Sequence, residues 1–143
     1  MAESVSSGVY SEQVNEVRLQ ITQIGEQVLR ESAHQLSRDE LVSAKIQELI
    51  EHKRETMRNA PGVGLAAPQV GISLQSAVIK DREEYHKELI PAQLSERQRQ
   101  PIPFDVIVNP RIISADNTSL GFFEGCLSVR DIQRSCRGHG RSL

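Results

Sequence analysis

Apolar side chains recur at helical spacing in the segment after Ser37, where Glu40 completes a capping-box pattern. The Ser37 hydroxyl and the Glu40 carboxylate can each satisfy a free backbone N–H group at the start of a helix. The apolar positions of the predicted face are Val42, Ile46, Leu49, Ile50 and Met57. Pro61 ends the pattern, because the residue before a proline is pushed out of the helical region. The sequence therefore predicts one amphipathic helix from about residue 38 to 58, with this face buried.

The rest of the chain predicts strands rather than further long helices. Short apolar, β-branched runs at 74–80, 104–109 and 119–123 are typical of strands. Residues 81–103 are charged and rich in Gln, and predict a solvent-facing insertion that includes a surface His86. A helix followed by strands, without a βαβ rhythm, predicts an α+β fold in which the helix packs on short, mostly antiparallel strands. A helix is also predicted just before Gly25, from apolar residues at three- and four-residue steps.

The composition is that of an ordinary single domain, with 38% hydrophobic and 25% charged residues. A net charge of −2 gives no general attraction to nucleic acid or to an anionic membrane. No apolar run approaches membrane-spanning length, and two cysteines are too few for a secreted disulfide scaffold. The N-terminus has neither an apolar signal core nor the Arg-rich character of a transit peptide. We therefore expect a cytoplasmic protein without direct nucleic-acid or membrane partners.

Two short stretches carry the candidate chemistry. In GVGLAAPQVG at 62–71, Gly62 and Gly64 let a ligand approach the backbone, although a tight glycine turn explains them equally well. The Gln69 amide in the same stretch can donate to an oxygen that gains negative charge during attack on a carbonyl. EGCLSV at 124–129 contains Cys126, whose residue type alone fits a metal ligand, a nucleophile or a buried thiol.

A dinucleotide-binding loop is a competing interpretation of the first stretch. Gly62, Gly64 and Ala67 fit the GxGxxG/A pattern, and Glu83 and Glu84 lie about twenty residues further on. That motif comes after a strand and opens a helix. Here a predicted helix comes before it, and a proline and a glycine interrupt the residues after it. The context therefore rejects a nucleotide site.

Together the two stretches resemble the first two signature motifs of peptide deformylases, which remove the formyl group from the N-terminal methionine of new polypeptides. The resemblance implies that Cys126 is a metal ligand, and that the Gln69 amide and the Leu127 backbone N–H bind the oxyanion. It implies substrate contacts at Val63, Gly64, Phe122 and Glu124. One divalent ion is also implied, with Fe²⁺ expected and Zn²⁺, Ni²⁺ or Co²⁺ as replacements, to activate a water molecule. N-formylmethionyl nascent peptides are the implied partners, together with the ribosome.

The third deformylase motif, HExxH on a helix, does not occur in this sequence. It supplies two metal ligands and the general base, so the resemblance implies an incomplete metal site and an inactive, truncated chain. Cys136 and His139 have a C-x-x-H spacing but lie in a segment without a predicted structure to hold them. The alternatives are a non-catalytic deformylase-like module that binds formyl-methionyl chains or a ribosomal partner, and an error in the gene model.

The predicted domain limits correspond to the extent of the resemblance. Residues 1–20 are an N-terminal extension, and residues 21–129 form the truncated deformylase-like domain. Residues 130–143 carry four arginines and no helix or strand periodicity. This composition predicts an unrelated, disordered tail.

Overall fold

The computed structural model describes residues 17–139, with the backbone alone described at 120, 122, 123 and 130–139. The helical elements are η1 (Gln27–Leu29), α1 (Arg38–Leu41), α2 (Ala44–Asn59), η2 (Ala67–Val70), η3 (Glu83–His86) and α3 (Pro91–Glu96). The strands are β1 (Gly64–Ala66), β2 (Ser76–Asp81), β3 (Ile102–Val108), β4 (Ser119–Cys126) and β5 (Val129–His139). Within the described part of the chain, no helix is both long and apolar enough to cross a membrane.

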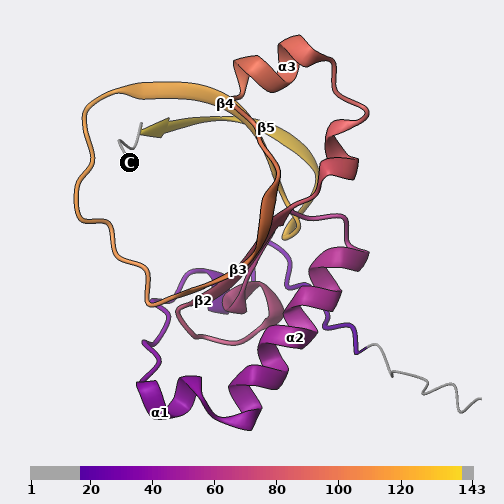
Figure 1. Ribbon diagram of the computed structural model, residues 1–143. Coiled ribbons are helices and arrows are strands. Elements are labelled where there is room, and N and C mark those ends of the chain that lie inside the picture. Colours follow the sequence, from indigo (N-terminus) through magenta and orange to yellow (C-terminus); the bar gives the residue numbers. More distant parts are fainter. Residues whose placement is uncertain (1–16, 140–143) are drawn as a thin grey trace, which may run out of the picture.

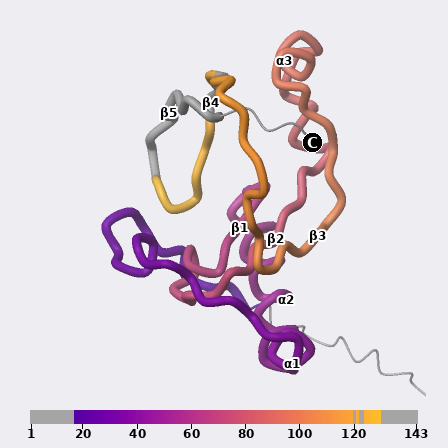
Figure 2. Tube along the Cα trace, turned by 90° about the vertical axis from the view of Figure 1, so that its left-hand side faces the viewer, coloured from indigo at the N-terminus to yellow at the C-terminus, as the bar shows by residue number. Residues whose placement is uncertain are grey.

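The strands form two separate antiparallel sheets. One has the order β1-β2-β3, with Val78 of β2 opposite Leu65 of β1 and Val106 of β3. The other is the β4–β5 hairpin, which closes with Cys126 opposite Val129. A wide loop leads from β3 to β4, and α3 lies at the opposite end of the molecule from α1 (Figure 1). Figure 2 shows β4 to one side of β1, β2 and β3 rather than among them. This arrangement confirms the predicted α+β class.

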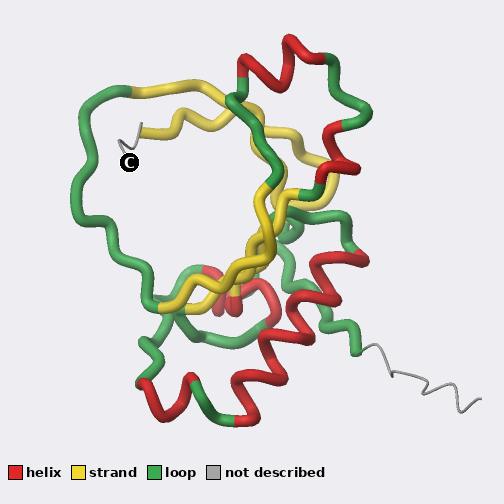
Figure 3. The backbone as a smooth tube through the Cα atoms, in the orientation of Figure 1, coloured by secondary structure: helices red, strands yellow, loops and turns green. Residues whose placement is uncertain are grey.

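The core lies between α2 and the first sheet. Its buried apolar members are Leu36, Ile46, Ile50, Met57, Leu65 and Val78. Leu49 and Val106 are half-buried and pack against this cluster. The predicted amphipathic face of α2 therefore covers the sheet, with Ile46, Ile50 and Met57 in the core. Figure 3 shows the α2 tube beside the strands of this sheet.

The predicted single helix is in fact two helices. Ser37 and Glu40 form the predicted capping box, with Glu40 N–H donating to Ser37 Oγ at 3.2 Å and Ser37 N–H donating to Glu40 Oε2 at 2.8 Å. The first helix then ends at Leu41, and Ser43 caps a second one by accepting from the Ile46 N–H. Val42 lies in the break and is 76% exposed, so its assignment to the buried face was wrong.

The three predicted strands correspond to β2, β3 and β4. The segment after them, however, differs from expectation. The backbone of Val129–His139 forms β5 and pairs along β4, from Ser119 opposite His139 to Cys126 opposite Val129. The expectation of a tail without secondary structure was wrong for residues 130–139. Strand pairing satisfies backbone groups whatever the side chains, so a segment without apolar alternation can still extend a hairpin.

The insertion between β2 and β3 is more ordered than its composition predicts. It carries η3 and α3, and its Arg99 donates from Nε and Nη2 to the two Asp81 carboxylate oxygens at 2.7 and 2.9 Å. His86, predicted to lie on the surface, is only 9% exposed, with its Nε2 3.1 Å from Asp81 Oδ1. The prediction was wrong because the buried Asp81 carboxylate at the end of β2 contacts the side chains of both His86 and Arg99.

Residues 17–24 form no helix, which corrects the expectation for the described part of that segment. Their backbone N–H groups bond to other elements instead of to one another. Leu19 N–H donates to Thr56 Oγ1 at 2.9 Å, and Ile24 N–H donates to Ser128 O at 2.8 Å. The segment is therefore an extended connection across the surface of the domain.

Candidate functional site

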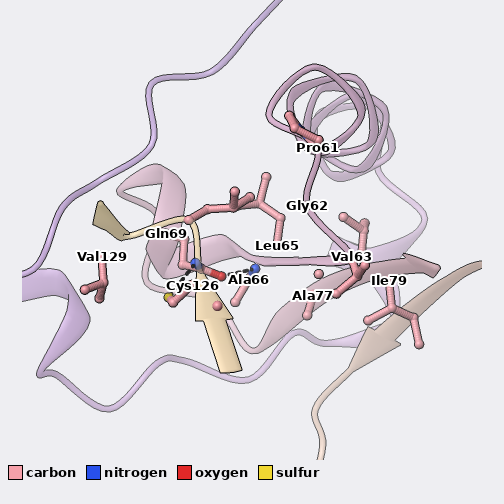
Figure 4. Close-up of a pocket in the computed structure, with 14 residues that line it drawn as sticks. Pro61, Gly62, Val63, Leu65, Ala66, Gln69, Ala77, Ile79, Cys126 and Val129 are labelled. Carbon is pink, nitrogen blue, oxygen red and sulfur yellow. Dashed lines mark hydrogen bonds between the residues drawn. The ribbon is translucent and has the colours of Figure 1, made fainter. Parts of the chain in front are cut away.

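A cavity of about 890 Å³ lies between β1, β2 and the turn of the β4–β5 hairpin. It is lined by Pro61, Gly62, Val63, Gly64, Leu65, Ala66, Gln69, Ala77, Val78, Ile79, Gly125, Cys126, Leu127 and Val129. Most of these side chains are aliphatic. Figure 4 shows that Gln69 and Cys126 meet in one part of the cavity, while Val63 and Ile79 line another. The cavity thus has a polar end and an apolar wall.

The fold fixes the orientation of the Gln69 amide. Gln69 lies on η2, and its Oε1 accepts from the Ala66 N–H at 2.9 Å. Because that partner is a donor, the amide nitrogen must point the other way. Nε2 indeed contacts Ser128 Oγ at 3.2 Å and Cys126 Sγ at 3.7 Å. The donor end of Gln69 therefore points toward the hairpin turn and the cavity.

Cys126 is the exposed thiol at the end of β4. It lies 57 positions from Gln69 in sequence, yet the two side chains are within hydrogen-bonding contact. Two residues to which the family resemblance assigns roles in one site therefore meet at one cavity. The turn after Cys126 reverses the chain into β5, so the hairpin itself brings the thiol to Gln69.

The Leu127 side chain packs closely against the first glycine of GVGLAAPQVG. A Cβ atom at Gly62 would lie 2.6 Å from Leu127 Cδ1, closer than real Cβ contacts, and 3.1 Å from Leu127 Cγ. Gly64 has no such neighbour, since a Cβ there would meet Ile79 Cγ2 at 3.8 Å. The absence of a side chain at Gly62 therefore lets Leu127 occupy its place beside the loop.

The other predicted substrate positions divide into two groups. Val63, which is 46% exposed, and Gly64 line the cavity. Glu124 is exposed and does not belong to the lining, while the Phe122 side chain lies outside the described residues. The structure adds Ala77 and Ile79 to the cavity wall. These two alternate with buried residues on β2, so strand periodicity could have placed them on one face but not beside the site.

Sequence reasoning also missed Ser128, which is only 4% exposed. Its hydroxyl accepts from the Gln69 amide and so joins the hairpin turn to η2. The only available signal was its place inside EGCLSV. A serine in a turn is so common that its residue type alone indicates nothing further.

The residues at the cavity do not fit a complete metal site. Among the side chains that the structure describes, no three His, Cys, Asp or Glu residues lie close enough to hold an ion. Of the described residues that line the cavity, Cys126 alone is of one of these types. Open catalytic zinc sites, by comparison, use three protein ligands. The side chains of Cys136 and His139 lie outside the described residues.

The comparisons with known proteins agree with this geometry. The family profile described as polypeptide deformylase matches residues 18–138. Peptide deformylase 1A of tomato chloroplasts is 42% identical over 109 residues, which cover 76% of this chain and 39% of that protein. Peptide deformylase 1 of Streptomyces coelicolor is 44% identical over 111 residues, 78% of this chain and 49% of that protein. The chain therefore spans less than half the length of these two curated relatives.

A solved structure extends the likeness to the fold. The Met-Ala-Ser-bound class I type b peptide deformylase of Acinetobacter baumannii is similar with a TM-score of 0.72 and 30% identity. The match covers 87% of this chain and 72% of that one. The profile match reaches beyond Val129, so the family resemblance includes most of β5 as well. The chain belongs to the peptide deformylase family.

Proposed function

We propose that this chain provides the substrate-binding part of a peptide deformylase, an enzyme that hydrolyses the N-formyl group of formyl-methionyl nascent polypeptides. The observation that carries the proposal is the meeting of the Gln69 amide and the Cys126 thiol, 3.7 Å apart, at the polar end of an otherwise aliphatic cavity. A formyl group at that end would place its carbonyl oxygen beside a fixed N–H donor.

Gln69 is suited to hold an oxygen that becomes negative. Its amide orientation is set by Ala66, so little reorganisation is needed when charge develops. The contact from Nε2 to the Cys126 sulfur is long and weak. A developing oxyanion is a much better acceptor and would replace it. The Leu127 backbone N–H is the second donor in this proposal, as the family resemblance implies.

The aliphatic wall is suited to a methionine side chain. Val63, Ala77 and Ile79 offer apolar surface without a charge, which fits an unbranched thioether. Gly64 lies on β1, an edge strand of the first sheet. An extended peptide can add to such an edge through backbone hydrogen bonds. We therefore place the methionine in the cavity and the later residues of the peptide along β1.

The hydrolytic step needs groups that the described residues do not include. Cys126 alone does not hold a divalent ion tightly, and no acidic residue lines the cavity to act as a base. We therefore propose that the 143-residue chain binds Fe²⁺ or Ni²⁺ poorly and releases formate no faster than background. The choice of Fe²⁺, delivery of nascent chains by the ribosome and a cytoplasmic location belong to the same proposal and rest on the resemblance.

Formate release from formyl-Met-Ala-Ser with added Fe²⁺ or Ni²⁺ tests the proposal. Three proteins are compared: this chain, its Cys126→Ala variant, and the chain extended after residue 138 by the C-terminal part of a peptide deformylase. Turnover by the extended protein alone, lost when it carries Cys126→Ala, supports the proposal. Turnover by the 143-residue chain that disappears in Cys126→Ala contradicts the expected inactivity. Absence of turnover in the extended protein contradicts the deformylase assignment.

A second candidate is a module that binds formyl-methionyl chains without hydrolysing them. Among the described residues, one metal-ligand side chain lies at a well-formed cavity, and this favours the binding module. Titration of the 143-residue chain with formyl-Met-Ala-Ser distinguishes the two. Saturable binding that Val63→Arg abolishes, with no turnover even by the extended protein, supports the binding module.

A further inference from the structure

The turn that carries the proposed oxyanion donor is held by the extended segment before Gly25. Leu127 and Ser128 form the two-residue turn between β4 and β5. Carbonyl groups of such turn residues point out of the hairpin and need partners elsewhere. Here Leu127 O accepts from Gln23 Nε2 at 3.1 Å, and Ser128 O accepts from Ile24 N–H at 2.8 Å. Two successive carbonyls of the turn are therefore fixed by two successive residues.

The same segment also holds the other half of the site. Thr22 N–H donates to the Gln69 carbonyl oxygen at 2.7 Å. Residues 22–24, which we call the clip, thus bond both to η2 and to the hairpin turn. The hairpin belongs to a separate sheet from β1 and β2. The clip therefore links two parts of the fold that no strand pairing joins.

Gln23 is the residue of the clip that bonds to the turn through its side chain. The Thr22 and Ile24 bonds come from the backbone, and most residue types would keep them. The Gln23 amide instead donates to two carbonyls, Ile21 O at 3.3 Å and Leu127 O at 3.1 Å. The bond to Ile21 O fixes the orientation of the amide within its own segment. The bond to Leu127 O links that segment to the turn, 104 positions further along the chain.

We propose that Gln23 is a positioning residue of the substrate site, which sets the Leu127 peptide groups against Gln69 without touching the substrate. The proposal rests on the proposed function for its consequence, since only a bound formyl group would use that alignment. Loss of the Gln23 donor frees Leu127 O and lets the turn rotate about its two flanking strands. The Ser128 hydroxyl and the Cys126 side chain then leave their places beside the Gln69 amide.

The chain contains a matched control for this bond. Gln75 is also half-buried, and its Nε2 donates to a distant backbone carbonyl, Ala33 O, at 3.0 Å. That bond ties the segment leading into β2 to the N-terminal segment and lies outside the cavity lining. Gln75→Leu therefore removes a similar side-chain bond from the scaffold while leaving the turn alone.

The experiment compares Gln23→Leu, Gln23→Glu and Gln75→Leu in the 143-residue chain at pH 7. Glutamate keeps the size of glutamine but presents only acceptors to two carbonyls, so it separates the hydrogen bond from packing. We measure amide hydrogen exchange at Ile24, the backbone resonances of residues 126–129, and affinity for formyl-Met-Ala-Ser. Both Gln23 variants should raise Ile24 exchange about tenfold over Gln75→Leu, shift the turn resonances and weaken peptide binding about tenfold, the effect of one net hydrogen bond.

Two results would overturn the proposal. The first is that either Gln23 variant shows the same resonances for residues 126–129 and the same Ile24 exchange rate as Gln75→Leu. The other is a displaced turn with unchanged peptide affinity. A wild-type chain that does not bind the peptide contradicts the proposed function instead. In that case the resonances and exchange rates still decide whether Gln23 holds the turn.

Discussion

Lys53 is a charged residue at an unusual position, because its side chain is fully buried on the face of α2 that packs against the core. Its Nζ contacts Ser76 Oγ at 2.8 Å, and that hydroxyl is a neutral partner. Burial lowers the pKa of the Lys53 ammonium to about 8. The helical spacing of Ile46, Ile50 and Met57 places residue 53 on the buried face. The sequence thus contained the signal, but lysine at such a position is normally assigned to the surface.

Replacing Lys53 by methionine should stabilise the protein at pH 7. Methionine fills similar space without the cost of burying a charge, and such replacements of buried ions are neutral to stabilising by roughly 1–4 kcal/mol. Urea unfolding measures the change, with Lys45→Met on the exposed side of the same helix as the control. Because the folded-state pKa is depressed, the wild type should gain stability as pH rises from about 8 to 10.5, and Lys53→Met should not. A less stable Lys53→Met protein at pH 7 would contradict this account.

The two glycines of the first motif should respond differently to alanine. Gly62→Ala places a methyl group 2.6 Å from Leu127 Cδ1, so the Leu127 side chain must shift out of its place beside the loop. Such overpacking costs roughly 1–3 kcal/mol. Gly64→Ala meets only ordinary contacts at 3.8 Å and should fold with nearly wild-type stability. Urea unfolding and the Leu127 methyl resonances check both. Equal effects of the two substitutions would mean that the Leu127 side chain adapts without a cost in stability.

At the scale of elements, the break between α1 and α2 shows why a periodic pattern overestimates helix length. The spacing continues through Val42, but Ser43 offers a second cap, and its Oγ also donates to Glu40 O at 2.6 Å. A serine that bonds to nearby backbone competes with helical continuation. β5 shows the opposite error, because the hairpin partner, rather than apolar alternation, determines that strand. The type of an element was predictable where the helix or strand preference of its residues agrees with the pattern of buried positions.

The second cap can be tested directly. Ser43→Ala removes the acceptor for the Ile46 N–H and the donor to Glu40 O, so the start of α2 loses both bonds. We expect a loss of about 1 kcal/mol, which is typical of an N-cap substitution. Ser114→Ala, at an exposed position in the loop before β4, is the control. Thermal unfolding of the two variants provides the measurement, and a Ser43→Ala protein as stable as the control would show that the helices simply fuse.

At the scale of the whole molecule, the site depends on contacts that sequence order hides. The pairing of Gln69 with Cys126 was predictable because both belong to motifs that resemble one family. Gln23 and Ser128 had no such motif role, and their partners lie on segments distant in sequence. The residues alone did not indicate which contacts fix the position of one sheet relative to the other.

The charged insertion provides the last whole-molecule test, through Asp81. Burial by itself would raise the pKa of this carboxyl, but the hydrogen bonds from Arg99 and the close contact with His86 outweigh that effect, and the pKa lies below its ordinary value of 3.8. The ionised carboxylate therefore stabilises the fold above about pH 4, and this contribution disappears as pH falls through the folded-state pKa. Asp81→Asn should cost roughly 1–3 kcal/mol at pH 7, because Arg99 loses its charged partner.

The same substitution should flatten the acid limb of the stability curve. Wild type and Asp81→Asn are compared by urea unfolding between pH 7 and pH 2, with Asp116→Asn in the exposed loop before β4 as the control. The difference between wild type and Asp81→Asn should be constant down to about pH 4 and shrink below it, since protonation removes the charge that the substitution removes. Proteolysis within residues 82–100 should rise in Asp81→Asn as well, because Arg99 then no longer ties α3 to the end of β2. A pH-independent difference would show that Asp81 acts through packing rather than through its charge.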